Sequence, residues 1–318
     1  MVVEGKTKNW TAADMPDLSG KVAVVTGSNI GLGLEIIKRL AEHNATTIMA
    51  IRTVAKGEKA RDELLKEIGA DKKIEIMAVD VSSLESVKKF ADEFNSKYDR
   101  LDVLMENAGI MALETRQESV DGYEMQFATN HLGHFRLTNL LMPLLKKTQG
   151  SRVVAQSSSA NWYGNFDWDN LNATKSYDPW VQYCMTKLSN VFFASELNAR
   201  VKAAGLEQPT AYSTHPGLVV GQLQEKGKQG FFEKLMYMVT TPMAGTYETG
   251  ARPALFACTS PAATPGAFYG PTGWVPMVRH LGGKYPGEVA PNKLSLDVAM
   301  RKKLWEESEK LTKAEFKI

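Results

Sequence analysis

The sequence predicts an α/β protein in which helices cover both faces of one doubly wound parallel sheet. Short apolar segments alternate along the chain with segments of helical periodicity. The apolar segments are too uniformly hydrophobic to have one face in water, which is typical of strands covered on both sides. Right-handed crossovers between such strands give a three-layer Rossmann fold. The 318 residues, 43% of them hydrophobic, suffice for one large core.

The predicted elements follow one another without a break that would mark a second domain. The helix after the first strand has Leu34, Ile36 and Leu40 at helical spacing, and Ser82 with Glu85 predicts a capping box for the helix that runs toward Tyr98. Residues 1–20 are expected to form a surface arm, and residues 21–318 a single domain. Six strands are predicted, at 22–26, 46–51, 74–79, 103–106, 152–156 and 210–213.

A glycine-rich turn lies between the first strand and the first helix. Gly27, Gly31 and Gly33 follow the pattern Gly-x-x-x-Gly-x-Gly, with Ser28, Asn29 and Ile30 between the first two. Glycines let the backbone approach a pyrophosphate, whose charge is stabilised by the free amides and positive dipole end of the next helix. We therefore interpret the turn as a variant dinucleotide-binding loop. The alternative is a purely structural turn.

Tyr183 and Lys187 are four residues apart in a predicted helix and therefore lie on the same face. A lysine charge close to a phenol favours the phenolate and brings the pKa of the tyrosine toward the range of acid/base work near neutral pH. The pair predicts a proton-donor site.

Together these motifs resemble the short-chain dehydrogenase/reductase family, from about Leu18 to Phe316. Further landmarks occur in the family's order: Asp80, the segment Asn107-Ala108-Gly109, Asn130, the Ser-Ser-x-Ala pattern at 157–160, and His215-Pro216-Gly217. Within the family, the chain resembles the retinol dehydrogenase and WW-domain oxidoreductase branch, with protochlorophyllide reductases as more distant relatives.

The resemblance implies a role for each landmark in reduction of a carbonyl group. Tyr183 donates the proton, Ser158 binds the carbonyl oxygen, and Lys187 holds the nicotinamide ribose. Ser157 and Ser159 remain alternatives to Ser158, and Asn130 extends a water relay. The cofactor residues that the resemblance implies are Asp80, Val81, Asn107, Ala108, Gly109, Tyr183, Lys187, Pro216, Gly217 and Val219; Asp80 could alternatively only start a helix.

The residue after the second strand predicts which cofactor binds. An acidic residue there would bind the ribose hydroxyls of NAD and repel a 2′-phosphate. This chain instead has Arg52, whose planar guanidinium suits a phosphate, and Lys56 could assist. We therefore expect NADP(H) rather than NAD(H). The alternative for Arg52 is a solvated surface residue.

A substrate lid is predicted at about 220–245, because it contains an apolar stripe with Phe231, Phe232 and Met236. Trp162, Tyr163 and Trp168 are candidates for a second wall of the substrate site. The lid suits an apolar substrate; a helix packed on the core or on another subunit, and a shallow membrane contact, are the alternatives.

Two residues depart from the family pattern near the cofactor. Glu106 replaces a usual asparagine and is expected to cap its loop, with cofactor contact as the alternative. Gly221 stands where many relatives have threonine, so one cofactor contact is expected to come from backbone or water.

The composition excludes several classes of function. The net charge is +2 and no basic stripe is present, so we expect no nucleic-acid partner. Cys184 and Cys258 are the only cysteines and suit a reducing compartment. No apolar segment is long enough to span a bilayer, so we expect a soluble, cytoplasmic homodimer or monomer. His131 and His134 could pose as a metal pair, but no third ligand is evident, so no metal is expected.

The predicted function is that of an NADP(H)-dependent oxidoreductase. It would interconvert an apolar or aromatic aldehyde or ketone with its alcohol, and Tyr183 would be the general acid/base. The alternative is a catalytically weak nucleotide-sensing protein that binds a partner through the lid and the C-terminal helix around 296–311.

Overall fold

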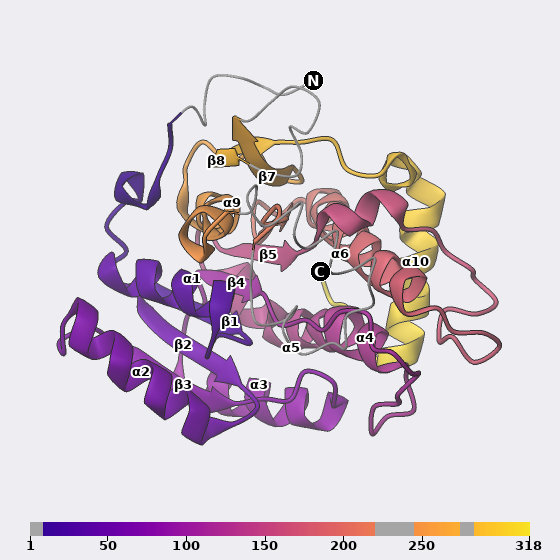
Figure 1. Cartoon of the computed structure of the whole chain (residues 1–318), viewed down its shortest axis with the longest axis horizontal. Helices are drawn as coiled ribbons and strands as arrows, with labels where there is room; N and C mark the ends of the chain where they lie inside the picture. The colour runs from indigo at the N-terminus through magenta and orange to yellow at the C-terminus, as the bar shows by residue number, and fades with distance from the viewer. Residues whose placement is uncertain (1–8, 220–244, 274–282) are drawn as a thin grey trace, which may run out of the picture.

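The strands of the computed structural model form one sheet (Figure 1). The structure describes residues 9–219, 245–273 and 283–318. Within them the sheet has eight strands in the order β3-β2-β1-β4-β5-β6-β7-β8, all parallel except β8. The strands are β1 (Val22–Thr26), β2 (Thr46–Ile51), β3 (Ile74–Ala78), β4 (Val103–Glu106), β5 (Arg152–Gln156), β6 (Thr210–Thr214), β7 (Phe268–Gly273) and β8 (Gly283–Glu288).

The predicted doubly wound sheet is confirmed, and two strands were missed. β3 ends one residue earlier than predicted and β6 ends one residue later. β7 and β8 form an antiparallel pair at the edge of the sheet, and both contain glycine and proline. Those residues are depleted in strands and are tolerated at edges, so these two segments lack the apolar pattern that predicts a strand.

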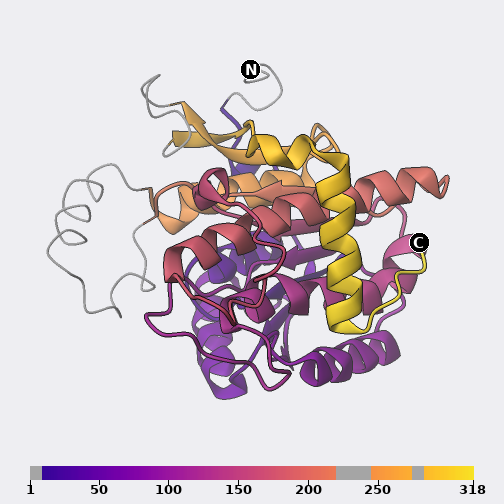
Figure 2. The same cartoon turned by 90° about the vertical axis from the view of Figure 1, so that its right-hand side faces the viewer.

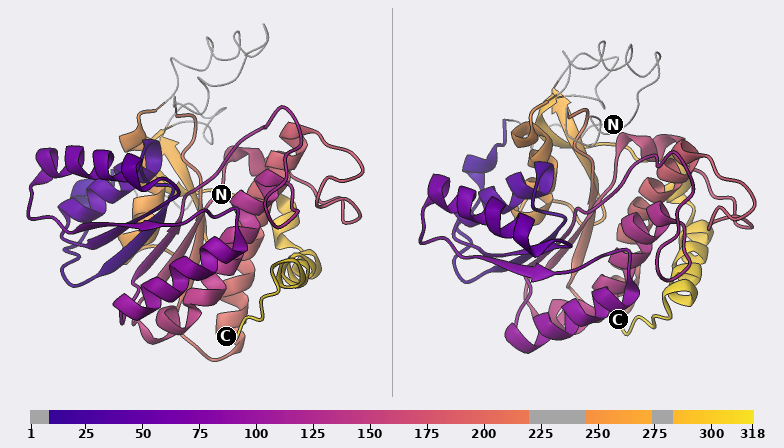
Figure 3. Two further views of the ribbon diagram at one scale, coloured as in Figure 1. Left: turned by 90° about the horizontal axis from the view of Figure 1, so that it is seen from below. Right: turned by 60° about the horizontal axis from the view of Figure 1, so that its bottom comes forward.

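Helices cover both faces of the sheet (Figure 3). α1, α2 and α9 pack on one face, while α3, α5 and α6 pack on the other. The helices are α1 (Gly31–Glu42), α2 (Val54–Ile68), α3 (Leu84–Lys97), α4 (Met125–Phe127), α5 (Gly133–Lys147), α6 (Pro179–Ala203), α9 (Tyr247–Thr259) and α10 (Val298–Thr312). Short 3₁₀-helices are η1 (Ala12–Asp14), η3 (Ser159–Tyr163) and η6 (Lys293–Leu296), and η2 (Ala128–Leu132) is a short π-helix.

Strand alternation decides which side chains reach which layer. In β1, Ala23 and Val25 pack toward α1 and α9, whereas Val22 and Val24 pack toward α3, α5 and α6. The last residue of β1, Thr26, continues the second series and faces α5. This direction brings its hydroxyl to a histidine of α5, as described below.

Part of the expected N-terminal arm needs correction. Trp10, Met15 and Leu18 are buried in the same core cluster as α1 and α9. The Trp10 ring meets Phe256 of α9 edge-on, with the ring centroids 5.3 Å apart. The segment packs there because burial of these apolar side chains is favourable, and their wide spacing gives no periodic signal in the sequence.

The predicted capping box at Ser82 and Glu85 is wrong by one residue. The N-cap of α3 is Ser83, whose hydroxyl accepts a hydrogen bond from the Ser86 amide. Ser82 instead donates its hydroxyl and its amide to Asp80 Oδ1, at 2.6 and 3.0 Å. Asp80 thus takes the turn-forming role that leaves Ser82 outside the helix.

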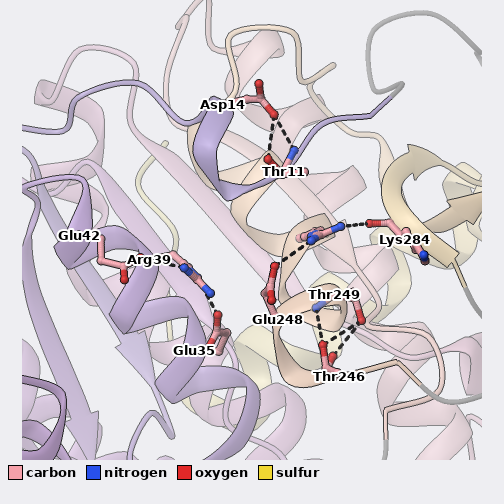
Figure 4. Close-up of polar contacts among 10 residues, drawn as sticks. Thr11, Asp14, Glu35, Arg39, Glu42, Thr246, Glu248, Thr249 and Lys284 are labelled. Atoms are coloured by element: carbon pink, nitrogen blue, oxygen red, sulfur yellow. Dashed lines mark hydrogen bonds and ion pairs between the residues drawn. The ribbon is translucent and has the colours of Figure 1, made fainter. Parts of the chain in front are cut away.

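Helix α9 follows the predicted lid in the chain. Polar contacts of Thr246 and Arg252 anchor its N-terminal half (Figure 4). Thr246 caps it by accepting from the Thr249 amide. Arg252 donates to Glu248 in the same helix and to the Lys284 carbonyl oxygen of β8, at 2.8 and 2.6 Å. These contacts hold α9 against the β7–β8 pair.

The C-terminal helix α10 lies across α6 (Figure 2). Its own residues Leu304 and Trp305 are buried, and the Trp305 ring stacks on Phe193 of α6 with the centroids 5.8 Å apart. The inner face of α10 is therefore part of the core. Among the described residues, every helix is too short or too polar to cross a bilayer.

Candidate active site

The glycine turn lies at the carboxyl end of β1, beside β4, where the order of the strands reverses. Gly27 has φ 64°, and a Cβ there would lie 2.9 Å from Ala108. Helix α1 begins at Gly31 after Ile30, whose side chain cannot cap, and no acidic residue lies in its first turn. The first amides of α1 are therefore left for an anion, which fits the pyrophosphate of a dinucleotide.

The remaining residues of the turn have different surroundings. A Cβ on Gly33 would lie 2.5 Å from Asn107 Nδ2, so this close approach requires glycine. Ser28 is fully buried and donates its hydroxyl to the Val25 carbonyl oxygen, which leaves only its backbone to face a ligand. Asn29 is half-buried, and Ile30 is 49% exposed.

Thr26 ties this turn to the loop after β4, a role that the sequence analysis missed. Its Oγ1 accepts hydrogen bonds from the amides of Asn107 and Ala108, both at 2.9 Å. Asn107 Nδ2 in return donates to the carbonyl oxygens of Thr26 and Gly27, at 2.9 and 3.2 Å. The two loops are thereby held as one backbone cradle.

Helix α6 carries Tyr183 and Lys187. It begins at Pro179, with Asp178 as its cap, because Asp178 Oδ1 accepts from the amides of Trp180 and Val181. Tyr183 and Lys187 are 8% and 5% exposed. Lys187 Nζ lies 5.7 Å from the centre of the Tyr183 ring and donates to the Gln156 carbonyl oxygen at 3.1 Å.

The structure distinguishes between the three serines after β5. Ser157 is buried and donates to the Lys187 carbonyl oxygen at 2.7 Å, so its hydroxyl holds α6 against β5. Ser158 caps η3, and its side chain acts on the phenol of Tyr183 by lowering the pKa of that phenol. Ser159 is the first residue of η3. Ser158 is therefore the serine that the fold brings to Tyr183.

Burial controls the protonation of the pair. It raises the pKa of Tyr183 to about 12, and the hydrogen bond from Ser158 offsets only part of that rise. It lowers the pKa of Lys187 to about 8. The expectation that the lysine brings the tyrosine pKa toward neutrality therefore needs correction, because desolvation of the phenolate outweighs an ammonium at this distance. At neutral pH the phenol holds its proton and the lysine is largely charged.

Asn130 lies in the short π-helix η2, next to α6. Its amide donates to the Ile110 carbonyl oxygen at 2.9 Å and to Thr186 Oγ1 at 3.0 Å, while its Oδ1 accepts from the Ile110 amide. A Cβ on Gly109 would lie 3.2 Å from both Asn130 Oδ1 and Lys187 Nζ. Asn130, Gly109 and Lys187 thus meet at one point.

Arg52 and Asp80 lie beyond the ends of β2 and β3. The Arg52 side chain is 76% exposed, and its Nη1 is 3.9 Å from Asp80 Oδ2. An ion pair this long and this exposed is weak and leaves the guanidinium accessible. Asp80 Oδ1 is already bound by Ser82, which favours the helix-start role, while Oδ2 remains for a ligand. Val81 is buried in the core cluster of α3 and α5.

The loop after β6 completes the site. Pro216 and Gly217 are half-buried, Gly217 has φ 71°, and its amide donates to His215 Nδ1 at 3.2 Å. Val219 pairs with Gly245 and lies close against Gly250 of α9. Gly221 lies outside the described residues.

Glu106 does not cap its loop, which corrects the expectation. The side chain is 1% exposed and accepts a hydrogen bond from Thr138 Oγ1 of α5. Alternation along β4 sends it to the α5 side, opposite to Met105. Burial raises the pKa of Glu106 to about 8, and the hydrogen bond from Thr138 offsets only part of that rise.

The candidate substrate residues are only partly described. Phe231, Phe232, Met236 and the predicted lid lie outside the described residues. Trp162 is half-buried, donates Nε1 to the Ala290 carbonyl oxygen and packs edge-on against His215, with ring centroids 5.4 Å apart. Trp168 instead stacks on Phe166 and lies under Lys303 of α10, so it does not form a wall with Trp162. Tyr163 is 75% exposed.

Two apolar residues beside Tyr183 escaped the sequence analysis. Trp180 is 48% exposed, and its ring lies 5.8 Å from that of Tyr183. Met111 packs against the cluster of Tyr183, Ala160 and Cys184. The three-residue spacing of Trp180 and Tyr183 on one helix was the available signal.

The two histidines bind different partners. His131 lies 2.9 Å from Ser308 Oγ of α10 and 3.4 Å from Asn190 Oδ1. His134 lies 2.9 Å from Thr26 Oγ1 and 3.3 Å from the Asn130 carbonyl oxygen. Each ring therefore belongs to its own hydrogen-bond network.

Comparison with known proteins gives consistent matches. The short chain dehydrogenase family model matches residues 21–208. Retinol dehydrogenase 11 of Homo sapiens is 37% identical over 238 residues, 75% of this chain and 72% of the relative. Retinol dehydrogenase 14 of Mus musculus is 32% identical over 306 residues, 92% and 86% of the two chains. A crystal structure of an uncharacterized protein from Mycobacterium paratuberculosis is similar with TM-score 0.78 and 36% identity, covering 97% of this chain and 99% of that one.

Proposed function

This chain belongs to the short chain dehydrogenase family, and on that premise we propose that it is an NADP(H)-dependent oxidoreductase. Its substrate pair is an apolar or aromatic aldehyde or ketone and the corresponding alcohol. The observation that carries the proposal is the meeting of Ser158, Tyr183 and Lys187 beside the backbone cradle of the glycine turn.

The chain's own residues supply the proton and the fixed charges. When bound, the nicotinamide dinucleotide supplies the hydride. Tyr183, protonated at neutral pH because its pKa is about 12, donates a proton to the oxygen of the reduced carbonyl group. Ser158 hydrogen-bonds the same oxygen as negative charge develops on it. Lys187 places a positive charge behind the phenol, which stabilises the phenolate left by the transfer.

The cradle residues support binding of a dinucleotide. The uncapped amides of α1 fit the pyrophosphate, and Asn107, Ala108 and Gly109 line the neighbouring loop. Arg52 supports the choice of NADP(H), because its exposed guanidinium stands beyond β2, where a 2′-phosphate would require a cation. Lys56, in the first turn of α2, is exposed as well and is a candidate second cation for that phosphate.

The surroundings of Tyr183 support an apolar substrate. Trp180 and Met111 present apolar surface beside the phenol. Two relatives are named as retinol dehydrogenases, so retinaldehyde belongs among the candidate substrates. A cytoplasmic location and a homodimer or monomer complete the proposal; the free thiols of Cys184 and Cys258 suit a reducing compartment.

The test is oxidation of NADPH and of NADH by the purified protein with a panel of apolar and aromatic aldehydes and ketones, retinaldehyde included. Turnover with NADPH that disappears in Tyr183→Phe is the expected result. Tight NADPH binding without turnover of any panel member would instead favour the nucleotide sensor. Leu304 and Trp305 on the inner face of α10 are buried, which speaks against a sensor that uses this face of the C-terminal helix.

A further inference from the structure

The Thr26 hydroxyl needs a hydrogen-bond acceptor, which the two amides that contact it in the cradle cannot provide. The amides of Asn107 and Ala108 each lie 2.9 Å from Thr26 Oγ1. Backbone amides only donate, so together they use both lone pairs of the hydroxyl oxygen. The hydroxyl hydrogen then needs an acceptor, because Thr26 is fully buried and an unpaired polar group there is costly.

His134 of α5 provides that acceptor. Its Nε2 lies 2.9 Å from Thr26 Oγ1, and its Nδ1 lies 3.3 Å from the Asn130 carbonyl oxygen. A carbonyl oxygen only accepts, so Nδ1 carries the hydrogen and Nε2 keeps its lone pair. Both contacts thus require the same tautomer. Burial lowers the pKa of His134 to about 3, which keeps the ring neutral at working pH.

We infer that His134 is a positioning residue that fixes the cofactor cradle by accepting the hydroxyl hydrogen of Thr26. With that hydrogen directed at His134, the Thr26 oxygen presents its lone pairs to the Asn107 and Ala108 amides. Asn107 in turn binds the carbonyl oxygens of Thr26 and Gly27. The inference rests on the proposed function, because the cradle binds a cofactor only if the site is one for a nicotinamide dinucleotide.

Removal of the acceptor has a specific consequence. The Thr26 hydroxyl would have to turn toward another acceptor, and the two amides would lose the oxygen that holds them. The loop after β4 would then be less well ordered before the cofactor binds, so the affinity for the cofactor would fall. Tyr183, Ser158 and Lys187 keep their own contacts to β5 and to each other, so turnover with saturating cofactor would change little.

His131 is a matched control. It lies three residues before His134, is 2% exposed as His134 is, and contacts Ser308 and Asn190 instead of the cradle. The same substitution at either position therefore removes a buried imidazole. Only the substitution at His134 removes the acceptor of Thr26.

The first experiment measures the Kd for NADPH by fluorescence titration. In His134→Leu we expect about tenfold weaker binding, the size of one net hydrogen bond, with kcat at saturating NADPH within about threefold of wild type. His134→Gln, whose carbonyl oxygen can reach Thr26, is expected to restore most of the affinity. In a Thr26→Val background, His134→Leu is expected to add no further loss.

A second readout needs no cofactor. Amide hydrogen exchange of Asn107 and Ala108, followed by NMR with selective ¹⁵N labelling, is expected to accelerate in His134→Leu and to stay unchanged in His131→Leu. If His134→Leu does not fold, His134→Asn replaces it, because its shorter side chain cannot reach Thr26.

Three results would overturn the inference: unchanged exchange of both amides, equal losses of NADPH affinity in the two histidine variants, or additive effects of the Thr26 and His134 substitutions. A wild-type protein that binds neither NADPH nor NADH, yet shows the expected change in exchange, would refute the proposed function and leave the positioning role of His134 intact.

Discussion

The cofactor half and the catalytic half of the site differ in whether backbone groups or side chains face the ligand. In the cofactor half, around Gly27 and Asn107, the groups that face a ligand are backbone amides, and side chains serve to hold that backbone. In the catalytic half, around Tyr183 and Lys187, the side chains themselves are the reactive groups, and the Gln156 carbonyl oxygen of β5 and the Ser157 hydroxyl hold Lys187 in place.

This difference predicts how the two halves respond to substitution. A side chain that holds backbone contributes equally to the ground state and the transition state, so its loss weakens cofactor binding. A side chain that transfers a proton acts only in the transition state, so its loss lowers kcat. Variants in the two halves should therefore separate into binding and rate effects.

The largest effect is expected in the catalytic half. Tyr183→Phe removes the proton donor and should lower kcat by roughly 10²- to 10⁴-fold, the usual contribution of a positioned general acid. The Kd for NADPH should stay unchanged, because the cradle does not use the phenol. Steady-state kinetics and fluorescence titration measure the two quantities. Near-normal turnover would show that Tyr183 is not the acid, and a large change in Kd would break the separation of the two halves.

The next largest effect is expected at Glu106. It concerns the free energy of unfolding rather than the activity. Its folded-state pKa of about 8 lies above the value of about 4.3 expected in the unfolded chain. Between these values the folded protein binds more protons, so the free energy of unfolding should fall as the pH rises toward 8 and then level off. Glu106→Gln should lose this dependence and be more stable at pH 8 by up to about 5 kcal/mol.

Urea unfolding at pH 5 and pH 8 measures this difference. Glu114→Gln, at an exposed position, controls for the loss of one negative charge. A Glu106→Gln protein that is less stable than wild type at pH 8 would contradict a neutral carboxyl at this position.

The sequence sufficed for the catalytic half and for six of the strands, because both depend on local signals. Tyr183 and Lys187 share a helix face by spacing alone, and the buried strands are continuous apolar runs. The direction in which the pKa of Tyr183 shifts was not predictable. It depends on how deeply the fold buries the phenol and on the 5.7 Å between Lys187 Nζ and the centre of the ring.

The cofactor half was predicted less completely, because its key contacts join residues far apart in the chain. Thr26 and His134 are 108 positions apart, and their meeting depends on which face of β1 packs on α5. The same alternation along β4 decides that Glu106 points to α5 instead of into its loop. Trp10 and the β7–β8 pair were missed because they are stabilised by tertiary contacts without a periodic pattern.

Arg52 is a direct test of the choice of cofactor within the cradle. Arg52→Ala should weaken NADPH binding by about 10- to 100-fold, as expected for loss of charge-assisted hydrogen bonds to a phosphate, and leave NADH binding almost unchanged. Lys59→Ala, at an exposed position of α2, controls for the loss of one positive charge. Equal losses for the two cofactors would show that Arg52 does not contact the 2′-phosphate.

The smallest expected effect is a fall of kcat at high pH, which tests the role of the Lys187 charge. Burial lowers the pKa of Lys187 to about 8, whereas that of Tyr183 is about 12, so the lysine loses its charge first as the pH rises. Reduction requires the charged lysine to stabilise the phenolate, so kcat should fall above pH 8, by about tenfold per unit at most. Because Lys187 is buried, the pH at which kcat begins to fall should hardly shift between about 0.05 and 0.5 M salt. A profile that stays flat to pH 10 would mean that the charge of Lys187 does not contribute to the rate, and the lysine would then belong with the residues that only hold the site together.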